Sequence, residues 1–194
     1  MQTIPGYDYG MRDVAHSPVN LDELRELEVA VGWTAADADA IALAGDVLAG
    51  QEEAMVDSWR AVIGKHEHLA KWFLGPDGKP DDAYKAAVKK RFVQWVTDTC
   101  RRPRDQAWLD YQEEIGLRHT PAKKNKTDAR HTPEVVPLRY LVAFSGVVIF
   151  GAREFLAKKG HAAADVERMQ RAWAKSVLLT LALWSRPYLR EGLW

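Results

Sequence analysis

Apolar residues recur at intervals of three and four positions along most of the chain, the spacing that places them on one face of an α-helix. This pattern predicts helices at residues 21–31, 34–50, 55–63, 81–101, 104–118, 136–159 and 163–185. No run of alternating apolar and polar residues between turn signals predicts a β-strand. The sequence therefore predicts an all-α fold in which layers of helices pack on one another.

Two segments fall outside this helical pattern. Residues 1–19 are rich in Gly, Pro and Tyr and show no periodicity, so we expect an extended N-terminal arm. We expect the polar loop at residues 121–134 to be solvated; its cations are Lys123, Lys124, Lys126 and Arg130. The turn at residues 75–81 is too short to be a domain linker, and no internal repeat is present. We therefore expect residues 1–194 to form one domain.

The charge balance and the hydrophobic pattern argue against nucleic acid and membranes as partners. The 27 Lys and Arg residues equal the 27 Asp and Glu residues, so there is no general attraction to nucleic acid or to an anionic membrane. The longest uncharged apolar stretch, Tyr140–Ala152, falls short of the roughly 18 to 20 residues that span a bilayer. A single cysteine and a first segment without a secretory signal predict a cytoplasmic protein, with neither nucleic acid nor membrane as partner.

One histidine stands out once the common site motifs are set aside. The sequence has no G-x-G-x-x-G and no G-x-S-x-G, and Cys100 has no partner cysteine, so we assign it no role. At about 100° per residue, His119 closes an apolar stripe with Trp108, Tyr111 and Ile115. The other five histidines lie in segments expected to be solvated. His119 is therefore either an axial ligand of haem in an apolar pocket or a hydrogen-bonded core residue.

Several segments spread along the chain are similar to those of one known family. They are IPGYDYG at 4–10, DTCRRP at 98–103, WLDYQEEIGLRHTPAKKNKTD at 108–128, PLRYLVAF at 137–144, FLAKKG at 155–160 and ALWSRPYLREG at 182–192. With these segments the chain resembles the protoglobins, single-domain haem proteins related to the sensor domains of globin-coupled sensors. The resemblance implies a globin-like helical sandwich with an extra N-terminal helix and an N-terminal arm that helps to bury haem b. It also makes His119, in the LRH at 117–119, the proximal ligand of the haem iron.

The same resemblance supplies residues for the opposite, distal side of the haem. The matching positions are Trp59, Arg60, Phe92 and Phe144. Arg60 departs from the family, which usually has Tyr there, and its guanidinium either donates a hydrogen bond to a bound ligand or turns outward. Arg91, beside Phe92, either pairs with a haem propionate or is an ordinary exposed helix arginine.

A second departure follows Phe144, where SGVVIFGAREF replaces a family segment that usually carries a proline. Ser145, Gly146 and Gly151 allow a neighbouring group to approach the backbone closely. This close approach either widens the pocket or serves ordinary helix packing.

The resemblance implies a haem protein that binds the diatomic gases O2, CO or NO reversibly at an open iron position opposite His119. Two alternatives use the same iron: a haem enzyme acting on nitrogen oxides or peroxide, and a gas-sensing module. The segments at 140–152 and 177–184 are apolar on nearly every face of the expected helix. This is more apolar surface than packing on one side of a core requires. Protoglobins pair through their last two long helices, so the resemblance also implies a homodimer.

Overall fold

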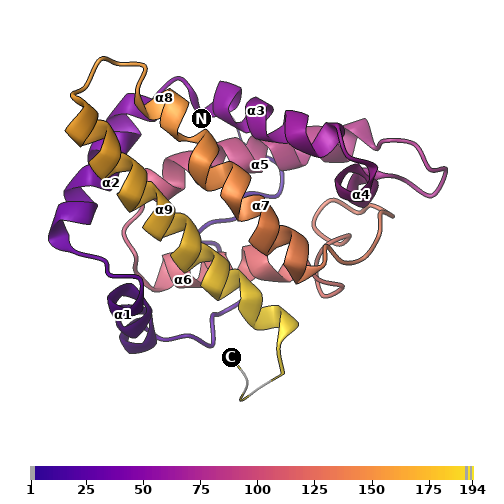
Figure 1. Ribbon diagram of the computed structural model, residues 1–194. Helices are drawn as coiled ribbons and strands as arrows, with labels where there is room; N and C mark the ends of the chain where they lie inside the picture. The colour runs from indigo at the N-terminus through magenta and orange to yellow at the C-terminus, as the bar shows by residue number, and fades with distance from the viewer. Residues whose placement is uncertain (1–2, 191, 193) are drawn as a thin grey trace.

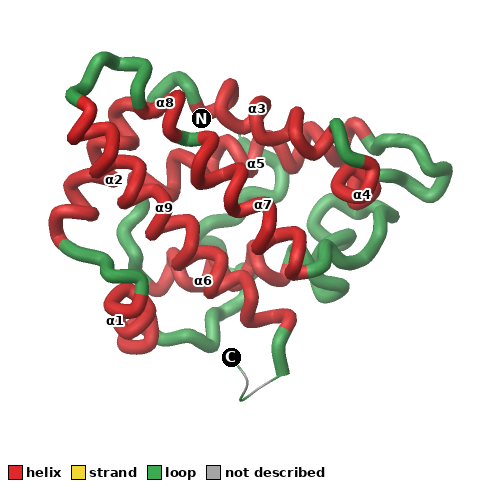
Figure 2. The backbone as a smooth tube through the Cα atoms, viewed as in Figure 1, coloured by secondary structure: helices red, strands yellow, loops and turns green. Residues whose placement is uncertain are grey.

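The computed structural model describes residues 3–190, 192 and 194, and its architecture is helical (Figure 1). The elements are α1 (Leu21–Ala30), α2 (Ala35–Leu48), α3 (Glu52–Gly64), α4 (Glu67–Ala70), η1 (Lys71–Phe73), α5 (Asp82–Arg101), α6 (Gln106–Leu117), α7 (Leu138–Gly151), α8 (Arg153–Leu156), α9 (Ala163–Ser185) and η2 (Arg186–Tyr188). Within the described residues there is no strand, and an isolated bridge joins Leu74 to Pro80 (Figure 2). The all-α prediction is confirmed. None of the described helices is both long and apolar enough to cross a membrane.

Side chains at the helix starts explain where the first two elements begin. The Asn20 side chain accepts hydrogen bonds from the backbone N–H groups of Asp22 and Glu23. The Thr34 side chain accepts one from the N–H of Asp37. In both helices the acidic residue of the first turn accepts a bond from the N-cap backbone in return, which completes a capping box. Short-range sequence therefore fixes the start of α1 and α2.

The prediction of one helix at residues 136–159 is wrong in one respect, because the structure has two helices there, α7 and α8, with a break at Ala152. Phe155 and Leu156 of α8 continue the buried face of α7 and join the core at 3% and 0% exposure. The indole of Trp59 fills the space beside Gly151, where a Cβ atom would lie 2.8 Å from Nε1. Periodicity did not reveal the break, because both pieces keep helical spacing.

Helix α9 organises the packing. It packs on α2, α6 and α7, while α5 packs on α2 and α3. Figure 1 shows α7 and α9 in front of α5 and α6, so the helices form two layers. Large buried side chains fill part of the space between them, with Trp59, Met169 and Trp173 at most 1% exposed. The rest of that space is a cavity.

The expected N-terminal arm contains no helix at residues 3–19; residues 1–2 lie outside the described residues. The backbone N–H of Ser17 donates to Asp110 of α6 at 2.9 Å, and further bonds join the arm to α5 and to Arg118, which follows α6. Arg118 donates hydrogen bonds to the Gly6 carbonyl at 2.6 Å and to the Asp8 carboxylate at 2.7 Å. Tyr7 donates its hydroxyl proton to Asp98 at 2.7 Å. Polar bonds to two helices therefore hold the arm on the body of the protein.

Candidate functional site

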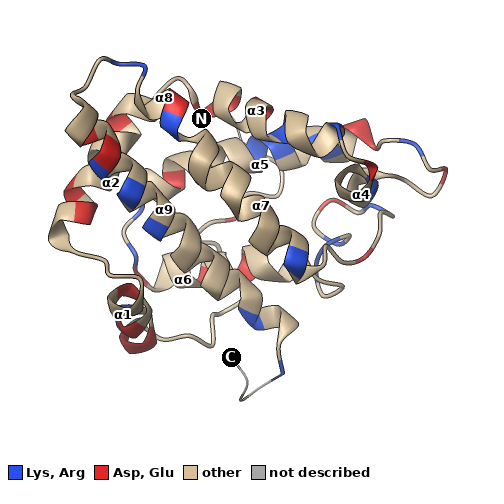
Figure 3. Cartoon of the chain, in the orientation of Figure 1, with Lys and Arg blue, Asp and Glu red and all other residues tan. Residues whose placement is uncertain are grey.

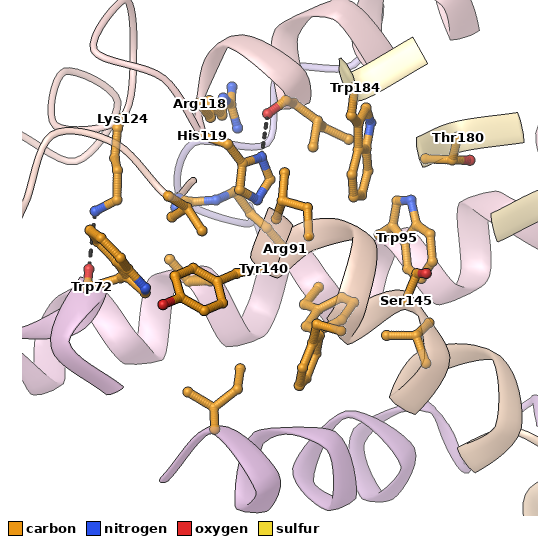
Figure 4. Close-up of a pocket in the computed structure, with 18 of the residues that line it drawn as sticks. Trp72, Arg91, Trp95, Arg118, His119, Lys124, Tyr140, Ser145, Thr180 and Trp184 are labelled. Atoms are coloured by element: carbon orange, nitrogen blue, oxygen red, sulfur yellow. Dashed lines mark hydrogen bonds between the residues drawn. The ribbon is translucent and has the colours of Figure 1, made fainter. Parts of the chain in front are cut away.

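A cavity of about 250 Å³ lies between α3, α5, α6, α7 and α9 (Figure 4). Its apolar lining is formed by Ile63, Leu69, Trp72, Phe73, Val88, Phe92, Trp95, Ile115, Val136, Leu141, Phe144, Val148, Val177, Leu181 and Trp184. Its polar lining includes Arg60, Arg91, Arg118, His119, Lys124, Thr127, Asp128, Ser145 and Thr180. Such a wall suits a ligand that is mostly apolar and carries a few polar groups.

His119 lies in the turn that follows α6 and lines the cavity. Its Nδ1 atom is 2.8 Å from the carbonyl oxygen of Ile115, one turn earlier (Figure 4). A carbonyl only accepts hydrogen bonds, so Nδ1 carries the hydrogen and Nε2 has a free lone pair. Burial lowers the pKa of His119 to about 4, which keeps the ring neutral at pH 7. The imidazole is therefore in the form that binds a metal ion.

Contacts from other elements hold His119 in place. The Trp184 ring of α9 stacks on the imidazole with ring centroids 5.5 Å apart, and its indole N–H donates to Gln112 at 3.0 Å. The His119 carbonyl accepts hydrogen bonds from the Val136 N–H at 2.9 Å and the Tyr188 hydroxyl at 3.2 Å. The other five histidines are all exposed, as their segments predicted. His119 is thus the histidine that faces the cavity.

Three aromatic residues were expected on the distal side, and the structure places two of them in the cavity lining and the third outside it. Phe92 and Phe144 both line the cavity. Trp59 is not part of the lining: its side chain is 1% exposed and lies behind Phe92, with ring centroids 5.3 Å apart. The indole sits in the interior because Gly151 leaves room for it. Trp59 therefore shapes the wall through Phe92, which corrects the expectation that it faces a ligand.

Arg60 lies in the cavity wall and is half-buried. Its Nη1 donates to the Lys85 carbonyl of α5 at 3.0 Å. Burial lowers the pKa of the guanidinium, against a smaller opposing effect of Asp57. Because one bond occupies only one of its five N–H groups, the side chain keeps donors available at the wall. The structure thus anchors Arg60 to α5 rather than turning it out into solvent.

Arg91 forms an ion pair inside the lining. It donates two hydrogen bonds to the Asp128 carboxylate, at 2.9 and 2.6 Å, and one to the Pro5 carbonyl at 2.9 Å. The side chains of Arg91 and Asp128 are 12% and 9% exposed, so Arg91 is not an ordinary exposed helix arginine. A ligand carboxylate would reach Arg91 by sharing it with Asp128.

Lys124 corrects the expectation of a solvated loop at residues 121–134. It is 3% exposed and lines the cavity, and its Nζ donates to the Trp72 carbonyl at 3.0 Å and the Thr132 hydroxyl at 2.6 Å (Figure 4). Burial lowers its pKa to about 8. The Asn125 side chain donates to the Thr132 carbonyl at 2.6 Å and folds the loop inward. A run of lysines carries no signal for this burial, because long-range contacts decide which lysine is covered.

The segment after Phe144, which differs from the usual family sequence, contributes to the cavity wall and to helix packing. Ser145 lines the cavity, and its hydroxyl donates to the Val142 carbonyl at 2.7 Å. Gly151 accommodates Trp59, so it serves packing rather than a wider pocket. At Gly146 an added Cβ atom would meet Phe150 at an ordinary 4.0 Å.

The lining fits a haem group. The neutral His119 supplies one axial nitrogen, and the aromatic and aliphatic walls match a flat apolar macrocycle. The cations Arg91, Arg118 and Lys124 are suitable partners for two propionate carboxylates. A helical sandwich around an apolar cavity with one such histidine is the arrangement of a globin.

Comparisons with known proteins agree with this class. The Protoglobin family matches residues 20–194, and the chain belongs to this family. Membership of a globin family implies a haem site. Among solved structures, the chain is similar to the globin domain of a Geobacter sulfurreducens globin-coupled sensor. The two share 13% identity over 86% of this chain and 97% of that chain, with a TM-score of 0.67. This likeness shows a globin fold. No curated protein matches the sequence.

Proposed function

We propose that the chain binds haem b in this cavity, with the iron held by Nε2 of His119, and that it binds O2, CO or NO reversibly. The observation that carries the proposal is the hydrogen bond from Nδ1 to Ile115, which leaves Nε2 with a lone pair in an apolar cavity. Haem, when bound, supplies an iron whose sixth position accepts a diatomic gas. Family membership supports the choice of cofactor.

The single cysteine argues against a covalently attached haem. A covalently attached haem needs thiols beside the macrocycle, and Cys100 is the chain's only cysteine. It is 7% exposed and lies against a separate small cavity with Gly45 and Leu48. Haem is therefore expected to be held by its axial bond and by packing, and the family supplies the choice of haem b among the haems held in this way.

The side chains of the wall have separate tasks in this proposal. Phe92 and Phe144 exclude water from the distal side. Arg60, fixed to α5 by the Lys85 carbonyl, has N–H groups that can donate to a bound oxygen atom. Arg118 and Lys124 are cations of the lining that would pair with the propionates through the N–H groups left after their bonds to Gly6 and Asp8 and to Trp72 and Thr132.

The first experiment is a set of visible spectra of the purified protein: ferric, reduced with dithionite, and reduced with CO. A ferrous form with five iron ligands that changes into a six-coordinate CO form would support both the haem and the open position. A pyridine haemochrome spectrum would identify haem b. The absence of visible absorption after reconstitution with haem would exclude the proposal.

Substitution of the axial residue tests the assignment. We expect His119→Ala to lose the five-coordinate ferrous spectrum, and added imidazole to restore it. The matched control is His131→Ala, because His131 is exposed and should keep the native spectrum. A native ferrous spectrum in His119→Ala would show that another residue holds the iron.

A homodimer through α7 and α9 is part of the proposal. On α7, Val142 and Phe150 are 52% and 76% exposed, and on α9 Leu178 is 46% exposed. Figure 3 shows α7 almost free of charged residues, and the C-terminal half of α9 has none in residues 176–185. An exposed face of this kind favours a second copy of the chain as its partner.

Light scattering coupled to size exclusion measures this pairing. We expect Phe150→Glu to convert a dimer into a monomer, because the charge would be buried in the interface. Val29→Glu is the matched control, since Val29 is 79% exposed on α1, away from this face. A monomeric native protein would contradict the dimer without affecting the haem proposal.

A further inference from the structure

Three tyrosines that the haem proposal leaves unused form a cluster beside the cavity. Tyr111 of α6 is 4% exposed, lines the cavity and lies on the helix stripe that leads to His119. The rings of Tyr7 and Tyr9, both on the N-terminal arm, each lie 5.3 Å from the Tyr111 ring between centroids. Interplanar angles of 74° and 64° make these edge-to-face contacts, so the rings touch.

Tyr7 is the member of the cluster whose hydroxyl is bound to a base. Its O–H donates to Oδ2 of Asp98 at 2.7 Å. Asp98 is 5% exposed, and its Oδ1 accepts from Gln94 at 2.9 Å and from Arg102 at 3.3 Å. Burial, followed by the bond to Asp98, raises the pKa of Tyr7 above its usual value. The phenol is therefore protonated at rest, and a carboxylate stands within reach to accept its proton.

The tyrosine cluster joins the cavity to the surface. Tyr7 is half-buried on the arm, so part of the residue is exposed to solvent. The tryptophans near His119 lead elsewhere. From Trp184 the ring contacts continue to Trp95 at 5.8 Å and Trp173 at 5.7 Å, and Trp173 is 0% exposed. The tyrosine series thus continues from the cavity wall onto the N-terminal arm, whereas the tryptophan series continues from the half-buried Trp184 into the interior.

We propose that Tyr111 and Tyr7 form a path by which an electron from the protein surface reaches the haem after it has reacted with hydrogen peroxide. The proposal rests on the proposed function, because it needs haem in the cavity. Haem, when bound, would supply the reaction with peroxide: the O–O bond would break, one oxygen would leave as water with both peroxide protons, and the haem would retain the other oxygen and supply one of the two electrons required. Tyr7 supplies the second electron through Tyr111. The phenolic proton of Tyr7 moves to Asp98, which leaves a neutral tyrosyl radical that a small reductant in solution can reach.

The test begins with haem-loaded ferric protein, whose loading is verified by visible absorption. The protein is mixed with an equimolar amount of hydrogen peroxide, frozen rapidly and measured by electron paramagnetic resonance. Ring-deuterated tyrosine identifies a tyrosyl signal, because deuterons narrow its hyperfine structure. We expect a tyrosyl signal in the native protein and its loss in Tyr7→Phe. We expect a weaker signal in Asp98→Asn, whose amide accepts a hydrogen bond but is a poor base.

Tyr9→Phe is the matched control. Tyr9 belongs to the same cluster, but no hydrogen bond from its hydroxyl to a carboxylate is found among the described residues, so its loss should leave the signal in place. A full signal in Tyr7→Phe, or a tryptophan signal alone in the native protein, would overturn the path while the haem absorption still supports the proposed function. Absence of haem absorption in the native protein would overturn both proposals.

A second measurement needs no haem. Ultraviolet titration of the haem-free protein follows the ionisation of each class of tyrosine. We expect Asp98→Asn to lower the pKa of one tyrosine, and Tyr7→Phe to remove that tyrosine from the titration. Circular dichroism checks that both variants are folded. If Tyr7→Phe removes a tyrosine that titrates in the native chain and folded Asp98→Asn leaves the pKa of that tyrosine unchanged, Tyr7 is not bonded to Asp98, which overturns the proposal.

Discussion

The Nδ1 atom of His119 and the carbonyl oxygen of Ile115 are 2.8 Å apart, so the imidazole is bonded to the helix that it follows. This contact sets the tautomer of the ring, and together with the stacked Trp184 ring it sets the rotation. In many metal sites a carboxylate from elsewhere in the chain performs this task. Here α6 itself accepts this hydrogen bond, so the orientation of Nε2, the proposed iron ligand, depends in part on local structure that the helix forms in any case.

The neutral state of His119 predicts a loss of stability in acid. Burial lowers the pKa of His119 to about 4 in the haem-free folded chain, from 6.5 when exposed. Between these values the unfolded chain binds a proton and the folded chain does not. The free energy of unfolding therefore falls as the pH falls, by about 3 kcal/mol at pH 4. Urea unfolding at pH 7 and pH 4.5 should show a smaller acid loss in His119→Leu than in the native chain. The exposed control His131→Leu should retain the native loss.

Gly151→Ala should destabilise the fold. The added Cβ atom would lie 2.8 Å from Nε1 of Trp59, which is fully enclosed. We expect a loss of about 1 to 3 kcal/mol in the free energy of unfolding, as for other overpacked cores. Gly146→Ala on the same helix is the control, since its Cβ would meet Phe150 at 4.0 Å. It should gain about 0.5 to 1 kcal/mol from the reduced flexibility of the chain. Equal effects of the two substitutions in thermal unfolding would contradict the packing of Trp59.

Arg60→Leu should speed the release of O2 from the ferrous haem protein. A hydrogen bond from a charged donor contributes about 1.5 to 3 kcal/mol, which corresponds to a rate increase of about 10-fold to 100-fold on its removal. Bound CO accepts hydrogen bonds poorly, so its release should change little and serves as an internal control. Flash photolysis and stopped-flow mixing give both rates. If O2 release is unchanged, Arg60 remains on the Lys85 carbonyl and does not contact the ligand.

Lys124→Met should change how stability depends on alkaline pH. Burial lowers the pKa of Lys124 to about 8, below its value of 10.5 when exposed. Above pH 8 the unfolded chain keeps a proton that the folded chain loses, so the free energy of unfolding rises with pH, by at most about 1.4 kcal/mol per pH unit. Urea unfolding between pH 7.5 and pH 9.5 should show this contribution in the native chain and not in Lys124→Met. Lys126→Met is the control, because Lys126 is exposed in the same loop. If the free energy of unfolding of Lys124→Met rises with pH as much as that of the native chain, another group is responsible for the effect.

The sequence predicted the long helices and the position of His119, because both follow from regular spacing along one helix. It did not predict the break at Ala152, because both pieces keep helical spacing. It placed Trp59 on the apolar face of its helix but not in the space beside Gly151, behind the cavity wall. Lys124 shows the same limit, since its burial is decided by contacts with Trp72 and Thr132. Periodicity describes an element's own faces, whereas the positions of Trp59 and Lys124 depend on what another element places against them.

The tryptophans of the cavity wall also give the protein an optical property. Of the eight in the chain, Trp72, Trp95 and Trp184 line the cavity. Haem absorbs where indoles emit, so excitation energy passes to a haem at such short range and the ultraviolet fluorescence is quenched. The emission intensity of the unlabelled chain therefore measures the fraction of cavities that are filled. It allows uptake and loss of the cofactor to be followed in real time at concentrations too low for visible absorption.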